Sequence, residues 1–300
     1  MKHNLININE CPLCGQKESK KHISATDHNV SNDLFTVVAC CSCGFKYTNP
    51  KPTEETIGNY YQSKNYISHT SSKKGIFNIV YHAVRDYQLK KKEKLILKHN
   101  NKNETKNLLD FGSGTGEFLN HCQNKGWKTL GVEPEKKAAD FAKKTHNINV
   151  VDVDDFFSNH QSEYDVITMW HVLEHVYDLE KYILHLHKRL NKNGILVLGL
   201  PNCNSYDANY YKENWAAWDL PIHLYHFTKK DIKKIADKYG FKVIETKPLL
   251  FDSFYISMLS EQKKGRSKLF GLWRGLVSNL KAKKHKEYSS HIYILRKQEV

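Results

Sequence analysis

The sequence lacks an apolar segment long enough to cross a membrane, and it lacks a recognisable export signal. A membrane-spanning helix needs about 20 mostly apolar residues. The longest apolar candidate, residues 248–259, is shorter than that and contains Asp252. The first residues hold no apolar stretch followed by a small-residue cleavage site, which a signal peptide would have. These absences lead us to expect a cytoplasmic protein.

Acidic residues are scarce relative to basic ones. There are 32 Asp and Glu against 46 Lys and Arg, which gives a formal net charge of +14. The surplus is local, because residues 64–106 and 261–300 each hold eleven Lys and Arg against three acidic residues. Such segments favour an anionic partner such as nucleic acid, anionic lipid or a phosphorylated substrate. A lysine-rich composition without functional meaning is the simpler alternative.

The composition excludes a chain that is mostly disordered. Hydrophobic residues make up 40% of the sequence and charged residues 26%, which is ordinary for globular proteins. The length of 300 residues predicts about two domains.

Cysteine is rare in the last 250 residues, where only Cys122 and Cys203 occur, and five of the seven lie within residues 1–50. An odd number of cysteines in a cytoplasmic protein favours metal binding over disulfides. Two C-x-x-C-G units can each supply one corner of a closed tetrahedral site. We therefore predict a zinc ribbon over residues 1–50 with a structural Zn²⁺. Cys41 is not expected to bind the metal. The alternatives are a ribbon without metal and a redox-active pair of cysteines. The expected ligands are Cys11, Cys14, Cys40 and Cys43.

Strands and helices are predicted to alternate along most of the chain. Residues 51–75 are predicted to be a linker, and residues 77–99 have the apolar spacing of a helix. The expected strands are residues 107–111, 128–133, 149–153, 165–169, 195–200, 241–247 and 291–296. Alternation of this kind indicates an α/β fold with a doubly wound, mostly parallel sheet.

A long insertion, residues 248–289, separates the last two strands. Within it Leu269, Trp273, Leu276 and Leu280 share one face of a predicted helix, surrounded by lysine and arginine. A basic amphipathic helix over residues 266–284 could lie on an anionic membrane surface. The alternative is an ordinary helix that packs this face on its own domain.

A glycine-rich turn follows the first strand of this pattern. Glu117 stands where a dinucleotide-binding turn would have its last glycine, which argues against a nicotinamide cofactor. Asp110, two residues before Gly112, would repel a pyrophosphate but suits an ammonium group. Glu133 ends the second strand, where a carboxylate commonly accepts hydrogen bonds from ribose hydroxyls. A ribose and a cation without a diphosphate are the features of S-adenosylmethionine.

Taken together, the motifs resemble those of the class I S-adenosylmethionine-dependent methyltransferases. LLDFGSGTGEFL looks like their first motif, GVEPE like the second, and LNKNGILVLGLPN like the fifth. DVITMWHVLEHV looks like the fourth-strand motif of ubiquinone-type O-methyltransferases and of bacterial sugar or polysaccharide methyltransferases. The resemblance implies a Rossmann-like domain over residues 76–300, with seven strands of which the last is antiparallel.

The resemblance also implies which residues hold the cofactor. Asp110 and the glycines would line its methionine part, Glu133 its ribose, and Trp170 would flank it. Asp152 is the candidate for the adenine amine, although Val153 or Asp154 could take that place. The full set of implied cofactor residues is Asp110, Gly112, Ser113, Gly114, Gly116, Glu133, Asp152 and Trp170.

Three histidines are candidates for catalysis. Transfer to a hydroxyl or a carbon acid requires a base, which contributes roughly 10²–10⁴ in rate. His171 and His175 follow the fourth strand, at the rim where ligands bind in such sheets. His223 lies in the segment after the fifth strand, where this family often places acceptor-binding elements, and Tyr225 is a further candidate there. The alternative is that His175 and Glu174 only orient the turn.

We expect methyl transfer to a small polar acceptor, namely a hydroxyl of a sugar or glycan precursor. One alternative is an RNA methyltransferase that grips phosphates with the ribbon and the basic helix. The other is a cofactor-binding module without catalysis.

Overall fold

The computed structural model describes residues 4–61, 76–100 and 106–298, without the side chains of residues 76–82. The helix expected at 77–99 is α3 (Ile76–Asn100), although its apolar residues Phe77, Val80 and Tyr81 have side chains outside the described part. Residues 62–75 of the expected linker also lie outside it.

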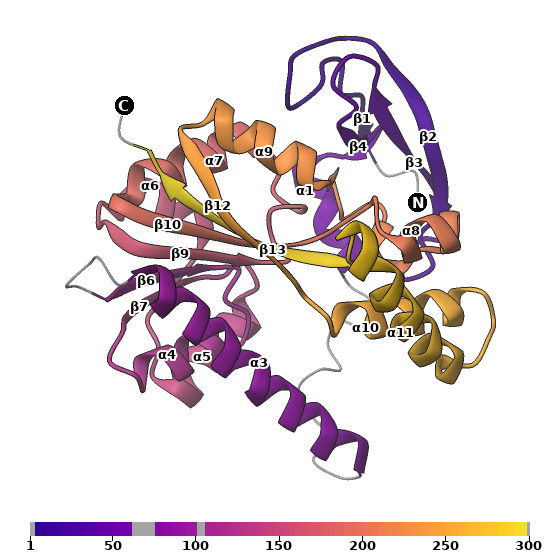
Figure 1. Ribbon diagram of the computed structural model, residues 1–300. Coiled ribbons are helices and arrows are strands. Elements are labelled where there is room, and N and C mark those ends of the chain that lie inside the picture. The colour runs from indigo at the N-terminus through magenta and orange to yellow at the C-terminus, as the bar shows by residue number, and fades with distance from the viewer. Residues whose placement is uncertain (1–3, 62–75, 101–105, 299–300) are drawn as a thin grey trace.

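A seven-stranded sheet forms the centre of the molecule (Figure 1). Its strands are β6 (Asn107–Phe111), β7 (Lys128–Val132), β8 (Val150–Val151), β9 (Tyr164–Trp170), β10 (Leu190–Pro201), β12 (Phe241–Pro248) and β13 (Ser290–Lys297). They lie side by side in the order β12-β13-β10-β9-β6-β7-β8. Only β13 runs antiparallel to its neighbours β10 and β12. The expected fold class, a doubly wound sheet whose last strand is antiparallel, is confirmed.

Helices cover both faces of this sheet (Figure 1). One face carries α3, α4 (Glu117–Gln123) and α5 (Lys136–His146), and the other carries α6 (Val153–Asn159), α7 (Leu179–Arg189) and α9 (Lys229–Lys238). The central strand β9 is buried along almost its whole length because helices pack on both of its sides. The carboxyl ends of β6, β7 and β9 therefore meet at one edge, where polar residues can surround a ligand.

The N-terminal module is not separate from the rest of the chain. Its elements are β1 (Leu5–Ile6), β2 (Ser19–Thr26), β3 (Leu34–Cys40), β4 (Lys46–Thr48), β5 (Lys51–Pro52), α1 (Glu54–Ile57) and the 3-10 helix η1 (Gly58–Tyr61). Strand β11 (Tyr225–His226), from far along the sequence, pairs with β4 and completes a four-stranded sheet. Strand β5 pairs with β1, so the described part of residues 51–75 is ordered structure that extends the module beyond residue 50.

The insertion forms a pair of packed helices, α10 (Asp252–Lys263) and α11 (Lys268–His285). They lie beside three shorter elements, α8 (Tyr206–Tyr211), η3 (Lys212–Asn214) and η4 (Ala216–Trp218). A Cβ at Gly271 would overlap Cα of Met258, and one at Gly275 would lie 2.6 Å from Cα of Phe254. The small residues of α11 thus face α10.

The large apolar residues of α11 point the other way. Leu269 is 74% exposed and Trp273 61%, and Leu276 and Leu280 are exposed as well. The interpretation that this face packs on its own domain is therefore wrong. None of the helices in the described residues combines the length and apolarity needed to span a bilayer.

Candidate functional site

The glycine-rich turn leaves β6 with three residues in the left-handed region. The φ angles of Gly112, Gly114 and Gly116 are +75°, +54° and +82°, which glycine adopts without strain. A Cβ at Gly112 would also overlap Cγ2 of Val172, a residue of the loop after β9. The turn therefore needs glycine both for its conformation and for the close approach of that loop.

Glu133 follows β7 and faces this turn. Its carboxylate accepts hydrogen bonds from the backbone N–H of Gly114 at 2.8 Å and of Glu135 at 3.0 Å. Burial raises the pKa of Glu133, and the two N–H groups act against that shift. The structure thus places this carboxylate beside the backbone of the turn. Its expected role in binding ribose hydroxyls stays a prediction.

Asp110 is buried at the carboxyl end of β6. The Thr168 hydroxyl donates to its Oδ1 at 2.5 Å. Burial raises the pKa of Asp110 to about 7, although Thr168 and the Lys92 ammonium favour its charged form. The group is therefore poised to ionise when a cation comes close.

Trp170 lies at the end of β9 with a cation on its ring. The Lys92 ammonium sits 3.9 Å from the ring centroid, and Phe118 contacts the ring edge-on. Gly199 makes room for it, since a Cβ there would lie 2.8 Å from the indole. Sequence reasoning gave no role to Lys92, because its position on the basic helix resembles that of many solvated lysines.

The other two predicted cofactor residues have more local contacts. Asp152 caps α6, and its Oδ1 accepts from the backbone N–H of Asp155 at 2.7 Å. Ser113 is buried in the turn, and its hydroxyl has no hydrogen-bond partner among the described residues. Both lie at the edge formed by the carboxyl ends of the strands.

A cavity of about 250 Å³ opens beside this edge, between α3 and the loops that follow β9 and β12. Its lining residues are Val84, Arg85, Gln88, Lys92, Trp170, His171, Leu249 and Asp252. Because Lys92 lines the cavity and interacts electrostatically with Asp110, the cavity lies close to Asp110.

His171 is the predicted catalytic histidine that faces this cavity. Its Nε2 lies 3.0 Å from Oδ2 of Asp252, and its Nδ1 lies 3.4 Å from Oε1 of Glu174. Burial would lower the pKa of His171, but the two carboxylates raise it to about 10. At neutral pH the ring is therefore a cation whose two N–H groups face these carboxylates, and it cannot take a further proton. Asp252 appeared in the sequence only as an interruption of an apolar run.

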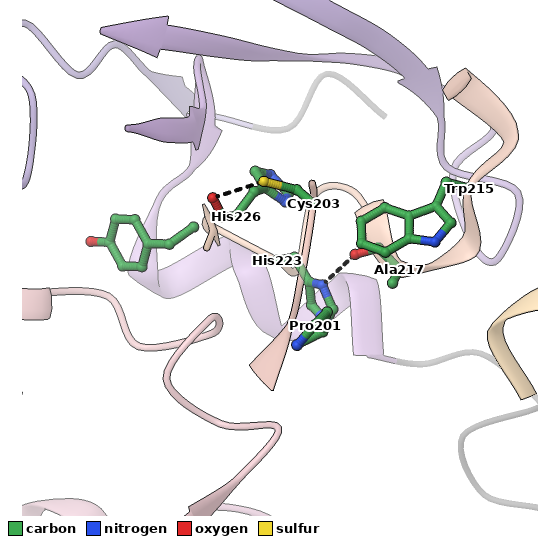
Figure 2. Close-up of a pocket in the computed structure, with 7 residues that line it drawn as sticks. Pro201, Cys203, Trp215, Ala217, His223 and His226 are labelled. Atoms are coloured by element: carbon green, nitrogen blue, oxygen red, sulfur yellow. Dashed lines mark hydrogen bonds between the residues drawn. The ribbon is translucent and has the colours of Figure 1, made fainter. Parts of the chain in front are cut away.

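His175 and His223 lie behind His171, with ring centroids 4.5 Å apart. Nδ1 of His175 is 3.1 Å from the carbonyl oxygen of Ile222. Nδ1 of His223 is 2.9 Å from the carbonyl oxygen of Ala217, the contact drawn in Figure 2. Burial lowers the pKa of His175 to about 4 and lowers that of His223 as well. Both rings are therefore neutral at neutral pH.

The pocket drawn in Figure 2 is too small for a substrate. It measures about 10 Å³ and is lined by His223, His226 and Cys203, whose thiol donates to the carbonyl oxygen of His226. The Tyr225 hydroxyl donates to the carbonyl oxygen of Tyr177, which makes this candidate a packing residue. The open cavity at His171 is therefore the better place for an acceptor.

The four predicted metal ligands come together in the N-terminal module. The sulfurs of Cys11 and Cys43 are 3.6 Å apart, as are those of Cys14 and Cys40. Tetrahedral zinc with Zn–S bonds of about 2.3 Å requires sulfur separations of about 3.8 Å, so the four thiols fit this metal. Cys41 is exposed and outside the cluster, as expected.

Comparison with known proteins agrees with this geometry. The sequence model of one family, described as a methyltransferase domain, matches residues 81–246, which is more than half of the chain. The chain belongs to this methyltransferase family. This family membership confirms the class expected from the sequence, a methyltransferase that uses S-adenosylmethionine.

One curated relative is the ubiquinone biosynthesis O-methyltransferase of Pelagibacter ubique (strain HTCC1062). It is 26% identical over 160 residues, which are 46% of this chain and 66% of the relative's length.

Two solved methyltransferases with bound S-adenosylhomocysteine share the fold. Magnesium protoporphyrin IX methyltransferase from Synechocystis PCC 6803 has a TM-score of 0.52 and 14% identity, and the match covers 82% of this chain and all of that one. An O-methyltransferase of a Brevibacillus brevis polyketide multienzyme has a TM-score of 0.51 and 15% identity, and the match covers 74% of this chain and 76% of that one. At these identities the likeness shows the fold of the methyltransferase domain.

Proposed function

We propose that this methyltransferase transfers the methyl group of S-adenosylmethionine to a hydroxyl of a sugar or glycan precursor that is held at an anionic membrane surface. The observation that carries the proposal is the cavity at His171, which is lined by Trp170 of the predicted cofactor residues and by Leu249, next to exposed apolar residues. The O-methyltransferase name of the curated relative supports a hydroxyl as the acceptor.

The chain's own residues are suited to hold the cofactor. Asp110 binds its ammonium group, Glu133 its ribose hydroxyls, and Asp152 its adenine amine, while Trp170 flanks it. Gly112, Gly114 and Gly116 let the backbone approach it closely. Bound S-adenosylmethionine supplies an electrophilic methyl group on a sulfonium.

The acceptor lies in the cavity. The His171 imidazolium, whose two nitrogens face the carboxylates of Asp252 and Glu174, places positive charge beside the acceptor oxygen. The carboxylate of Asp252, which also lines the cavity, takes up the hydroxyl proton as the methyl group is transferred. Holding two reactants in line is the larger part of what such an enzyme must do. Arg85 and Lys92 make the cavity positive, which favours an acceptor that carries a phosphate.

The exposed side of α11 is suited to bind the membrane. We define the α11 face as Leu269, Phe270, Trp273, Leu276 and Leu280, all exposed. The exposed lysines 268, 281, 283 and 284 belong to the same helix, and each contributes about 1 kcal/mol near an anionic surface. The exposed residues Leu250 and Phe251 adjoin Leu249 and Asp252 of the cavity wall, so the apolar surface continues toward the cavity. A lipid-linked acceptor could then enter from the membrane.

The cluster of four cysteines is proposed to bind a structural Zn²⁺. The four thiolates complete a closed tetrahedral site that leaves no coordination position for substrate. Cys11 and Cys40 belong to a core cluster that also contains residues of β9 and α9. The metal would therefore stabilise the surface on which β11 and the His223 segment are held.

A transfer assay tests the proposed acceptor. The full chain is incubated with methyl-labelled cofactor, anionic vesicles and an extract of lipid-linked glycans, and in parallel with total RNA. We expect label in the lipid-linked fraction, lost in His171→Ala and kept in the matched surface variant His28→Ala. Label in RNA would support the RNA alternative instead. Cofactor binding without label in any pool would support a non-catalytic module, and either result would overturn the proposal.

A sedimentation assay tests the membrane surface. Trp273→Glu should reduce binding of the full chain to anionic vesicles at least tenfold, because it places a charge in the α11 face. Leu34→Glu is the matched control, since Leu34 is 68% exposed on the N-terminal module. Equal loss in both variants, or no binding by the unaltered chain, would refute the membrane part.

A further inference from the structure

A second group of ligand atoms converges outside the cysteine cluster. Glu174, His175 and His223 each offer one atom, and the three atoms lie within 4.8 Å of one another. Glu174 and His175 come from the loop after β9, whereas His223 lies 48 residues further along, just before β11. The fold therefore brings these side chains together from separate segments.

The carboxylate of Glu174 is buried without a hydrogen bond. The residue is 1% exposed, and neither carboxylate oxygen has a hydrogen-bond partner among the described residues. Its ion contact with Nδ1 of His171 is 3.4 Å long. A buried carboxylate is costly unless it is hydrogen-bonded, paired closely or bound to a metal. The His171 imidazolium offsets part of this cost, and a second cation beside Glu174 would offset more of it.

The two imidazoles are fixed in the tautomer that a metal requires. Each has Nδ1 within hydrogen-bond distance of a backbone carbonyl, of Ile222 for His175 and of Ala217 for His223. The Tyr61 hydroxyl also lies 3.0 Å from Nδ1 of His175 and can accept from the same N–H. A carbonyl can only accept, so we assign the proton to Nδ1 in both rings, and Nε2 keeps its lone pair. Metal-binding histidines are typically oriented by such a second hydrogen bond. The nearby Asp219, whose Oδ2 is 4.0 Å from Nε2 of His223, adds negative charge.

We propose that Glu174, His175 and His223 bind a divalent transition-metal ion of the Zn²⁺ type. Two imidazoles and one carboxylate are the ligand set of zinc sites that keep a coordination position open, in contrast to the closed four-cysteine site. His171 contacts Glu174 and lines the cavity, so the ion would lie one side chain behind the acceptor. Binding of the ion does not depend on the identity of the acceptor.

Metal content measured on the full chain tests the proposal. After loading with Zn²⁺ and removal of loosely bound ions, the unaltered chain should hold two ions, one at the cysteines and one at the Glu174 cluster. Glu174→Gln and His223→Asn should each hold one, with affinity for the second ion reduced at least a hundredfold. His160→Asn, a histidine outside the cluster, should hold two. The ion kept by both cluster variants reports that they are folded.

Titration with Co²⁺ distinguishes the two sites by their ligands. The four-cysteine site gives strong thiolate charge-transfer absorption, whereas the Glu174 cluster should give weak visible bands without it. The weak bands should vanish in His223→Asn and remain in Cys43→Ser. A single bound ion in the unaltered chain, or unchanged weak bands in His223→Asn, would overturn the proposal. In that case Glu174 serves only as the ion partner of His171. Neither readout uses methyl transfer, so failure here leaves the proposed function standing.

Discussion

The variant Asp110→Asn should have two opposite effects. It should raise the stability of the cofactor-free protein, because a buried carboxylate is removed, and it should lower the affinity for S-adenosylmethionine. The pKa of Asp110 is raised from 3.8 to about 7, chiefly because the group is buried. Each pKa unit corresponds to about 1.4 kcal/mol, so holding the ionised form in the cofactor-free protein costs about 4 kcal/mol. The folded state binds the proton more tightly than the unfolded state, and stability should therefore fall as the pH rises from about 4 to about 7.

The asparagine variant should lack this part of the pH dependence. Above about pH 7 it should be more stable than the unaltered chain by up to about 4 kcal/mol, because the asparagine side chain carries no charge and its carbonyl can still accept from Thr168. Its affinity for S-adenosylmethionine should nevertheless fall by about 10- to 150-fold, the equivalent of one lost charge-assisted hydrogen bond of about 1.5–3 kcal/mol. In the unaltered chain that affinity should weaken about tenfold for each pH unit below 7.

Urea unfolding between about pH 5 and about pH 8, together with calorimetric titration of the cofactor, measures both effects. Asp237→Asn is the matched control, because Asp237 is exposed on α9. Stability curves of Asp110→Asn and the unaltered chain that run parallel with pH would refute the reasoning about burial. Equal cofactor affinity in the two proteins would refute the role of Asp110 in binding.

Three further changes have expected outcomes. Cys43→Ser should lose the ribbon zinc and lower the melting temperature, whereas Cys41→Ser should keep both, as metal analysis and thermal unfolding would show. Gly112→Ala should destabilise the chain by about 1–3 kcal/mol and abolish cofactor binding, since it combines a positive φ with a clash against Val172. Adding Val172→Ala should restore part of the stability if the clash contributes. Vesicle binding of the unaltered chain should weaken steeply with added salt, because lysines supply part of the attraction; salt-independent binding would contradict this.

The sequence was sufficient for the elements with a strong local pattern. The strands of the central sheet, the glycine-rich turn and the spacing of the two cysteine pairs are all set by neighbouring residues. The capping box of Thr228 and Asp231 at the start of α9 is likewise local, because its two residues are three positions apart. Pairing of β11 with β4 could not be predicted, because two residues carry too little pattern to specify a partner far along the chain.

Contacts between distant segments determine the rest of the site. The ion pair of His171 with Asp252 spans the insertion and decides the charge of the histidine, which the motif around His171 does not reveal. The orientation of α11 depends on which of two stripes packs inward. Its apolar stripe was visible in the sequence, but Gly271 and Gly275 allow so close an approach to α10 that the small-residue stripe packs instead.

Calorimetric titration of the full chain with S-adenosylmethionine tests the central claim most directly. The account predicts one binding site per chain, with affinity reduced at least tenfold in Glu133→Ala and unchanged in Glu163→Ala, which alters an exposed carboxylate elsewhere. A folded chain that does not bind the cofactor, or a Glu133→Ala variant that binds it as tightly as the unaltered protein, would contradict the account.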